Sequence, residues 1–100
     1  MLKVFISQPM NGKTNEEIKE ERAAIKEAVS RTFQNEDIEA IDSFIENAPH
    51  DANPLWYLGE SIKLMSTADI VVFSNDWREA RGCRAEFYLA TMYGMRTFEV

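Results

Sequence analysis

The chain has 100 residues, of which 45% are hydrophobic, and its formal net charge is −6. This length predicts one domain spanning residues 1–100, and the hydrophobic content favours a packed core over disorder. The negative charge argues against nucleic acid or an anionic membrane as the main partner, because both attract basic surfaces. The single cysteine excludes a disulfide framework and indicates a reducing cytoplasm. The sequence shows no signal peptide and no apolar run of transmembrane length.

Strand and helix signals alternate from the first residues onward. Residues 2–7 form an apolar run typical of a strand, and Pro9 with Asn11-Gly12 marks residues 8–13 as a loop. Thr14 begins a helix, because Thr14 and Glu17 have the spacing of a capping box. The apolar face of this helix is expected at Ile18, Ile25, Ala28, Val29 and Phe33, with Glu20, Glu21, Lys26 and Glu27 mostly on a solvated face.

The middle of the chain holds a short strand and a long connection. Residues 34–37 are the predicted turn, and the alternation in residues 38–41 predicts an edge strand with one wet face. Residues 42–53 are polar and long for a connection, which suggests a functional or mobile segment. Asn53 and Pro54 are typical of the cap and first position of a helix. Its buried stripe is expected at Leu55, Leu58, Ile62 and Met65.

The last third of the chain repeats the alternation. Residues 70–73, Ile-Val-Val-Phe, are typical of a strand buried on both faces. A polar loop, residues 74–82, leads to a helix over residues 83–93, which Gly94 is placed to terminate. Residues 96–100 form the last predicted strand.

This order predicts an α/β fold, a four-stranded parallel sheet in the order 2-1-3-4 with helices on both faces, a flavodoxin-like three-layer sandwich. The winding direction then reverses between the first and third strands. The loops 8–13 and 74–82 flank that reversal. Ligands bind at such positions in open α/β sheets, so we expect a site between these loops.

Glu86 is the leading candidate in the second loop and the helix that follows it. It lies in the first turn of the predicted helix, where the dipole favours an ionised carboxylate. It follows Gly82 and Cys83, whose small side chains let a ligand approach the backbone. A lone carboxylate can attack an anomeric carbon and hold a glycosyl group covalently. The alternative, that Glu86 only interacts with the dipole, stays open.

The loop itself carries further candidates. Asp76 is a candidate general acid or sugar-binding group, although loop aspartates more often cap a turn. Trp77 can stack on a base or cover the edge of the core. Arg78 and Arg81 can bind a phosphate or carboxylate, or pair with nearby acids.

Other reactive residues give weaker signals. Cys83 at a helix start is a candidate for a lowered pKa, but the only histidine, His50, lies in a distant loop, which argues against a Cys–His nucleophile. No Cys/His cluster supports zinc. Asp69 begins the third strand, at the opposite end of the sheet from the loops, and is expected to be structural.

The first loop supplies polar groups before a helix N-terminus, which favours anions. These groups are Ser7, Gln8, Asn11 and the N–H of Gly12. Gly12-Lys13-Thr14 matches the end of a phosphate-binding loop, but the upstream glycine is missing, so ATP hydrolysis is poorly supported.

Three segments carry a resemblance to a known family. They are Phe-Ile-Ser-Gln-Pro-Met-Asn-Gly at residues 5–12, Ala-Asp-Ile-Val-Val-Phe at 68–73, and Asp-Trp followed by Arg-Gly-Cys-Arg-Ala-Glu within 76–86. The chain resembles a group of small bacterial and phage proteins, which in turn is similar to the nucleoside 2-deoxyribosyltransferases. Those enzymes cleave an N-glycosidic bond through a glycosyl-enzyme intermediate and pass the sugar to another base.

The resemblance implies roles for particular residues. Glu86 corresponds to the nucleophile, and the first-loop residues that would hold the nucleoside are Ser7, Gln8, Met10, Asn11 and Gly12. Two acidic positions of the transferases are Ser61 and Ala80 here, so Asp76 or Glu60 is the candidate replacement. The transferases complete their sites across subunits, which implies a homo-oligomer.

The leading hypothesis is therefore a nucleoside- or nucleotide-processing enzyme, a deoxyribosyltransferase-like transferase or N-glycoside hydrolase. Glu86 would be the nucleophile, Asp76 or Glu60 would assist the base, and no metal or organic cofactor is implied. Further substrate contacts are expected from Trp77, Arg81, Gly82 and Cys83. The alternatives are a non-catalytic nucleotide- or ADP-ribose-type binding module and a phage or bacterial interaction protein with an acidic surface. A flavodoxin-like electron carrier is disfavoured, because no hydroxyl-rich phosphate loop follows the first strand.

Overall fold

A computed structural model describes residues 1–34, 36–43, 45 and 47–100. Its elements in chain order are β1 (Leu2–Ser7), α1 (Asn15–Thr32), β2 (Ile38–Ala40), α2 (Pro54–Met65), β3 (Ile70–Phe73), the short 3₁₀ helix η1 (Trp77–Glu79), α3 (Arg81–Met92) and β4 (Thr97–Glu99). The predicted turn 34–37 and the predicted connection 42–53 contain residues 35, 44 and 46, which lie outside this description. In the described part, no helix is both long and apolar enough to cross a membrane.

The four strands form one parallel sheet in the order β2-β1-β3-β4, as the sequence predicts. The central pair joins β1 to β3, with Val4 opposite Ile70 and Ser7 opposite Phe73. At the amino end of this pair, the Lys3 N–H donates to Asp69 Oδ2 at 2.8 Å and the Asp69 N–H donates to the Lys3 carbonyl at 2.8 Å. Asp69 therefore has the structural role that its position predicts.

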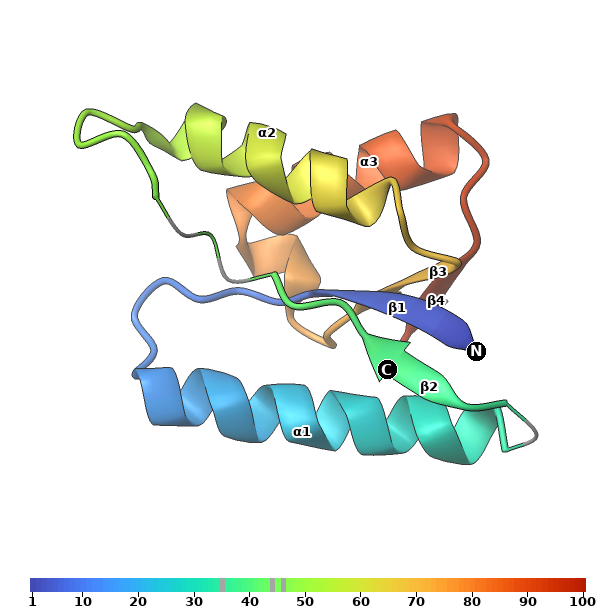
Figure 1. Cartoon of the computed structure of the whole chain (residues 1–100). Helices are drawn as coiled ribbons and strands as arrows, with labels where there is room; N and C mark the ends of the chain where they lie inside the picture. The colour runs from blue at the N-terminus through green and yellow to red at the C-terminus, as the bar shows by residue number, and fades with distance from the viewer. Residues whose placement is uncertain (35, 44, 46) are drawn as a thin grey trace.

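The sheet has a core on each face. Helix α1 covers one face, and α2 and α3 cover the other (Figure 1). The α1 side buries Val4, Ile6, Ile70 and Val72 of the strands against Ile25 and Val29. The opposite side buries Phe5, Val71 and Phe73 against Met65, Trp77, Cys83 and Ala90. Because β1 and β3 contribute to both cores, their residues form near-continuous apolar runs.

Local signals explain where the helices begin and end. Thr14 Oγ1 accepts from the Glu17 N–H at 3.1 Å and Glu17 Oε1 accepts from the Thr14 N–H at 3.0 Å, which completes the predicted capping box. The Asn53 side chain caps α2 through the Trp56 N–H at 2.9 Å. Gly94 follows α3 with φ +72°, a conformation that favours glycine, as predicted for a helix terminator.

Four expectations about the elements need correction. Strand β2 ends one residue early and β4 is shorter at both ends. Helix α3 begins at Arg81 instead of Cys83, because η1 shortens the loop that precedes it. Leu55 is 73% exposed, so its predicted place in the buried stripe is wrong. The first turn of α2 projects beyond the carboxyl ends of the strands, where no sheet lies beneath it (Figure 1).

Candidate active site at the carboxyl edge of the sheet

The exits of β1 and β3 lie side by side. The Ser74 N–H donates to the Ser7 carbonyl at 3.0 Å, so pairing continues one residue past the end of β3. Both serines are buried, although each stands at the start of a polar loop. The structure therefore brings together the two loops that the sequence predicts at the reversal of the winding.

Glu86 reaches this edge from α3. Its carboxylate Oε1 accepts a hydrogen bond from Ser7 Oγ at 2.8 Å, and the residue is 7% exposed. Burial raises the pKa of Glu86 to about 7, although the hydrogen bond from Ser7 opposes the increase. The expectation of a carboxylate ionised by the dipole is wrong, because Glu86 lies in the second turn of α3 and its desolvation dominates.

Cys83 lies one turn before Glu86 on the same helix and is also buried. Burial raises the pKa of its thiol to about 11, and the charges of Glu86 and Asp76 act in the same direction. The expectation of a lowered pKa is therefore wrong. The thiol is therefore neutral at pH 7, lines the site as a small side chain, and is not a nucleophile.

Asp76 follows β3 and belongs to a charged cluster. Its Oδ1 accepts from Ser74 Oγ at 2.7 Å, and its Oδ2 lies 3.1 Å from Lys13 Nζ. The hydrogen bond from Ser74 and the ammonium of Lys13 lower the pKa of Asp76. A carboxylate with a lowered pKa is ionised at neutral pH and is a poor proton donor. The structure thus disfavours the general-acid role and leaves hydrogen bonding to a sugar.

The cluster continues across the first loop into α1. Lys13 Nζ also lies 3.1 Å from Glu21 Oε2, and Glu21 Oε1 accepts from Gln8 Nε2 at 2.9 Å. The guanidinium of Arg22 donates to Gln8 Oε1 at 3.4 Å and to the Ile41 carbonyl at 2.8 Å. One chain of polar contacts therefore joins the exits of β1, β2 and β3.

Sequence reasoning missed Glu21 and Arg22 and wrongly assigned Glu21 to a solvated face. The available signal is their spacing from the apolar stripe. Glu21 and Arg22 lie three and four residues after Ile18, and Ile25 follows, so both charges fall on the face that meets the sheet. Charged residues on a buried face indicate partners in the fold.

Trp77 lies in the core. The residue is 6% exposed, and its ring packs on Phe73 and Phe87 and donates the indole N–H to Glu99 Oε1. The guanidinium of Arg78 lies 4.5 Å from the ring centroid. The sequence predicts two alternative roles for Trp77, stacking on a base and covering the edge of the core. The structure shows the second.

The remaining predicted residues are placed as follows. Met10, Asn11 and Gly12 lie on the exposed turn of the first loop, where Gly12 has φ +80°. Glu60 on α2 is half-buried and lies 3.3 Å from Lys63 Nζ of the same helix. The structure therefore brings Ser7, Cys83 and Glu86 together, and places Gln8 and Asp76 in the adjoining cluster.

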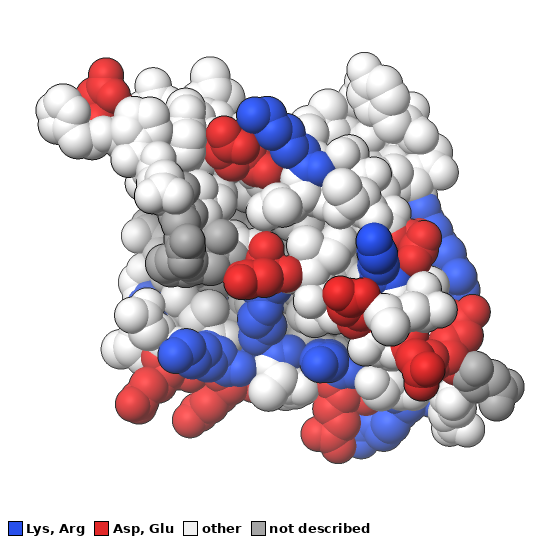
Figure 2. All heavy atoms as spheres, in the orientation of Figure 1, with Lys and Arg blue, Asp and Glu red and all other residues white. Residues whose placement is uncertain are grey.

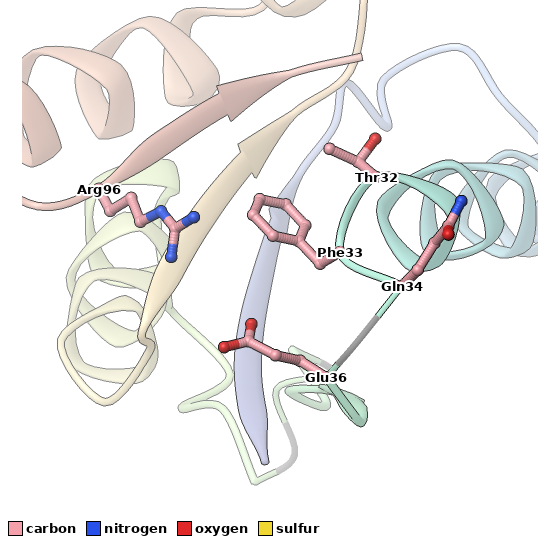
Figure 3. Close-up of a pocket in the computed structure, with 5 residues that line it drawn as sticks. All are labelled: Thr32, Phe33, Gln34, Glu36 and Arg96. Atoms are coloured by element: carbon pink, nitrogen blue, oxygen red, sulfur yellow. The ribbon is translucent and has the colours of Figure 1, made fainter.

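Two hollows flank the sheet at opposite ends. A groove of about 440 Å³ lies at the carboxyl edge and is lined by Asn53, Pro54, Leu55, Leu58, Arg81 and Gly82. A hollow of about 300 Å³ lies at the amino edge, between the end of α1 and the start of β4 (Figure 3). There Arg96 points towards the ring of Phe33, with its guanidinium 4.8 Å from the ring centroid. Of these two hollows in the described part of the chain, the first adjoins the predicted site, through Arg81 and Gly82.

The described residues contain no group of three or more His, Cys, Asp or Glu side chains that could hold a metal ion. No protein-family model, no curated protein and no solved structure matches the chain. The functional argument therefore rests on the geometry of the site.

Proposed function

We propose that the protein is an enzyme that cleaves or exchanges the N-glycosidic bond of a nucleoside or nucleotide, with Glu86 as the nucleophile. The observation that carries this proposal is a buried carboxyl group whose bonding partner, Ser7, is uncharged. A structural carboxylate is usually neutralised by a cation, whereas Glu86 is held by a hydroxyl at the site expected for ligands. Burial raises its pKa to about 7, so part of the Glu86 population is ionised at neutral pH, and only this ionised form can attack.

The reaction follows from this arrangement. Ser7 holds Oε1, and Oε2 of the ionised carboxylate attacks the anomeric carbon. The new C–O bond forms as the C–N bond breaks. The electron pair of the C–N bond goes to the base nitrogen, which takes a proton from water. Water or a second base then cleaves the glycosyl ester and regenerates the carboxylate. The Asp76 carboxylate accepts a hydrogen bond from a sugar hydroxyl.

The test is base release from deoxynucleosides and deoxynucleotides by the wild-type chain and by Glu86→Ala and Glu86→Gln. Both variants are expected to lose activity by at least about a thousandfold, because they lack the attacking oxygen. Unfolding curves and circular dichroism check that they remain folded. Glu20→Gln, an exposed position on α1, is the control and should keep full activity. If Glu86→Ala releases the base as fast as the wild-type chain, Glu86 is not the nucleophile.

A non-catalytic nucleotide-binding module is the second candidate. The observation that favours it is the ionised state of Asp76, which leaves the site without an evident proton donor for the departing base. Calorimetry with nucleoside monophosphates separates the two functions. Binding without base release by the wild-type chain selects this candidate.

We also propose that the chain self-associates in the cytoplasm through the outer face of α3. Tyr88 is 65% exposed and Met92 is 75% exposed, and the two residues are four apart on one face of the helix. In the view of Figure 2, charged side chains are more numerous over the α1 side of the molecule than over α2. Exposed apolar surface of this kind is typical of protein interfaces.

A further inference from the structure

The groove between α2 and α3 reaches the first turn of α3, one turn before Glu86, and shares no residue with the hydrogen-bonded cluster of Glu86. One wall comes from the first turns of α2 and presents Pro54, Leu55 and Leu58. The other wall comes from the first turn of α3 and presents Arg81 and Gly82. An apolar wall thus faces a wall that carries a cation.

Helical geometry connects this groove to Glu86. Gly82 precedes Glu86 by four residues, so the two lie on one face of α3. Side chains on a helix lean towards its N-terminus, which directs the Glu86 side chain towards the turn that contains Gly82. A Cβ atom at Gly82 would meet nothing within 4 Å. The wall of the groove therefore has open space at Gly82, one helical turn before Glu86.

Arg81 is the cation that this groove offers to a ligand. Among the described residues, the Arg81 side chain makes no hydrogen bond or ion pair. By contrast, Arg78 lies 3.7 Å from Glu99 and over Trp77, and Arg22 is held by Gln8 and a carbonyl. A guanidinium without an internal partner suits a phosphate, which it binds through two parallel N–H donors.

We propose that the groove binds the phosphorylated sugar of the substrate, with Arg81 on the phosphate, so that nucleoside monophosphates are preferred over nucleosides. This inference rests on the proposed function. Arg81 and Glu86 are separated by about 7.5 Å along α3, at 1.5 Å per residue, which a pentose phosphate can span. Pro54 and Leu58 pack on the carbon face of the sugar, and Gly82 leaves room for the ring beside Glu86.

The test compares deoxynucleoside 5′-monophosphates with the same deoxynucleosides, as substrates of the full chain and as calorimetric ligands. The wild-type chain is expected to prefer the monophosphate by about tenfold or more in kcat/KM and in affinity, the effect of one charge-assisted contact. Arg81→Gln should abolish this preference and leave the weaker activity on nucleosides. Arg84→Gln is the matched control, because Arg84 is an exposed arginine of the same helix outside the groove.

A second variant tests the open space at Gly82. Gly82→Ala is expected to fold at least as stably as the wild-type chain, because the methyl group meets no atom and alanine favours a helix. Its affinity for the monophosphate should nevertheless fall severalfold. Unchanged affinity in Gly82→Ala, or an equal preference in Arg81→Gln and the wild-type chain, would overturn the inference.

The two readouts separate the inference from the proposed function. If the chain releases the base but does not prefer the monophosphate, the proposed enzymatic function is supported and the proposed phosphate site in the groove is refuted. Binding of the monophosphate that depends on Arg81, without base release, supports the groove and refutes the enzyme. The absence of both binding and base release refutes both.

Discussion

Glu86 combines strong burial with an uncharged partner. Its pKa is about 7 in the folded chain, above the ordinary value of 4.5. Between these two values, the folded chain binds more protons than the unfolded chain, so the free energy of unfolding falls as the pH rises. Above pH 7 the folded chain bears the full cost of an ionised buried carboxylate. The site is therefore least favourable to stability in the state that the proposed reaction needs.

The pH dependence of unfolding tests this conclusion. Between about pH 4.5 and pH 7, the Glu86 contribution should lower the free energy of unfolding of the wild-type chain by up to about 3 kcal/mol, at 1.36 kcal/mol per pKa unit. Glu86→Gln lacks this titration and should be more stable than the wild-type chain at pH 8. Urea unfolding at pH 5 and pH 8 measures the difference. If the free energy of unfolding changes equally between pH 5 and pH 8 in the wild-type chain and in Glu86→Gln, the carboxyl group has an ordinary pKa.

Single residues also mark the limit of what the sequence can predict about the site. Glu86 and Ser7 are predictable together, because strand order and loop position bring them to one edge. The protonation state of Glu86 is not predictable from the sequence, because it depends on burial. The position of a residue in a helix does not reveal its burial. The network of Lys13, Glu21 and Asp76 depends on side-chain directions that only the folded chain defines.

The loops are held in place by contacts between elements. Lys13 in the β1–α1 loop bridges Glu21 of α1 and Asp76 after β3, and both carboxylates lie 3.1 Å from its Nζ. The hydrogen bonds that the Lys13 ammonium donates, to Glu21 first and then to Asp76, raise the pKa of Lys13, so the bridge persists at neutral pH. The first loop is thereby fixed against the loop that leads to α3.

A double-mutant cycle with Lys13→Gln and Asp76→Asn measures this link. We expect a coupling free energy of about 0.5–1 kcal/mol, because the two side chains are only partly exposed. The coupling should shrink as salt is added. Lys19→Gln, an exposed lysine of α1, provides the control in urea unfolding. A coupling of zero at low salt would mean that the ion pair does not hold the loops together.

Among the elements, the sequence predicts best those that carry a local signal in their own residues. Capping side chains and apolar runs are local signals, so β1, α1 and the start of α2 are as expected. The exposure of Leu55 is not local, because it depends on how far α2 extends past the sheet. The early start of α3 has the same origin, since η1 and the packing of Trp77 shorten the loop.

Charged and apolar side chains are unevenly distributed over the molecule. In the view of Figure 2, more charged side chains lie over the α1 side than over α2, and α3 exposes Tyr88, Met92 and Tyr93. A chain of 100 residues buries a smaller fraction of its surface than a larger domain does, so the proposed association would add to its stability. The arrangement favours pairing through α3 over pairing through α1.

Light scattering during gel filtration tests the association. The wild-type chain should elute as an oligomer at micromolar concentration, and Tyr88→Glu should shift it to the monomer by placing a charge in the interface. Ser30→Glu adds the same charge on the exposed surface of α1 and should leave the oligomer intact. A monomeric wild-type chain at high concentration would refute the proposed association.

The pairing of β1 with β3 also has a consequence for how the chain folds during its synthesis. Lys3 and Asp69, which join these strands, are 66 positions apart in the sequence. A nascent chain on the ribosome therefore holds the future centre of the sheet as an unpaired apolar edge until Ile70–Phe73 has emerged. Folding is then a late event that follows the synthesis of most of the chain, and prematurely released fragments carry an edge open to aggregation.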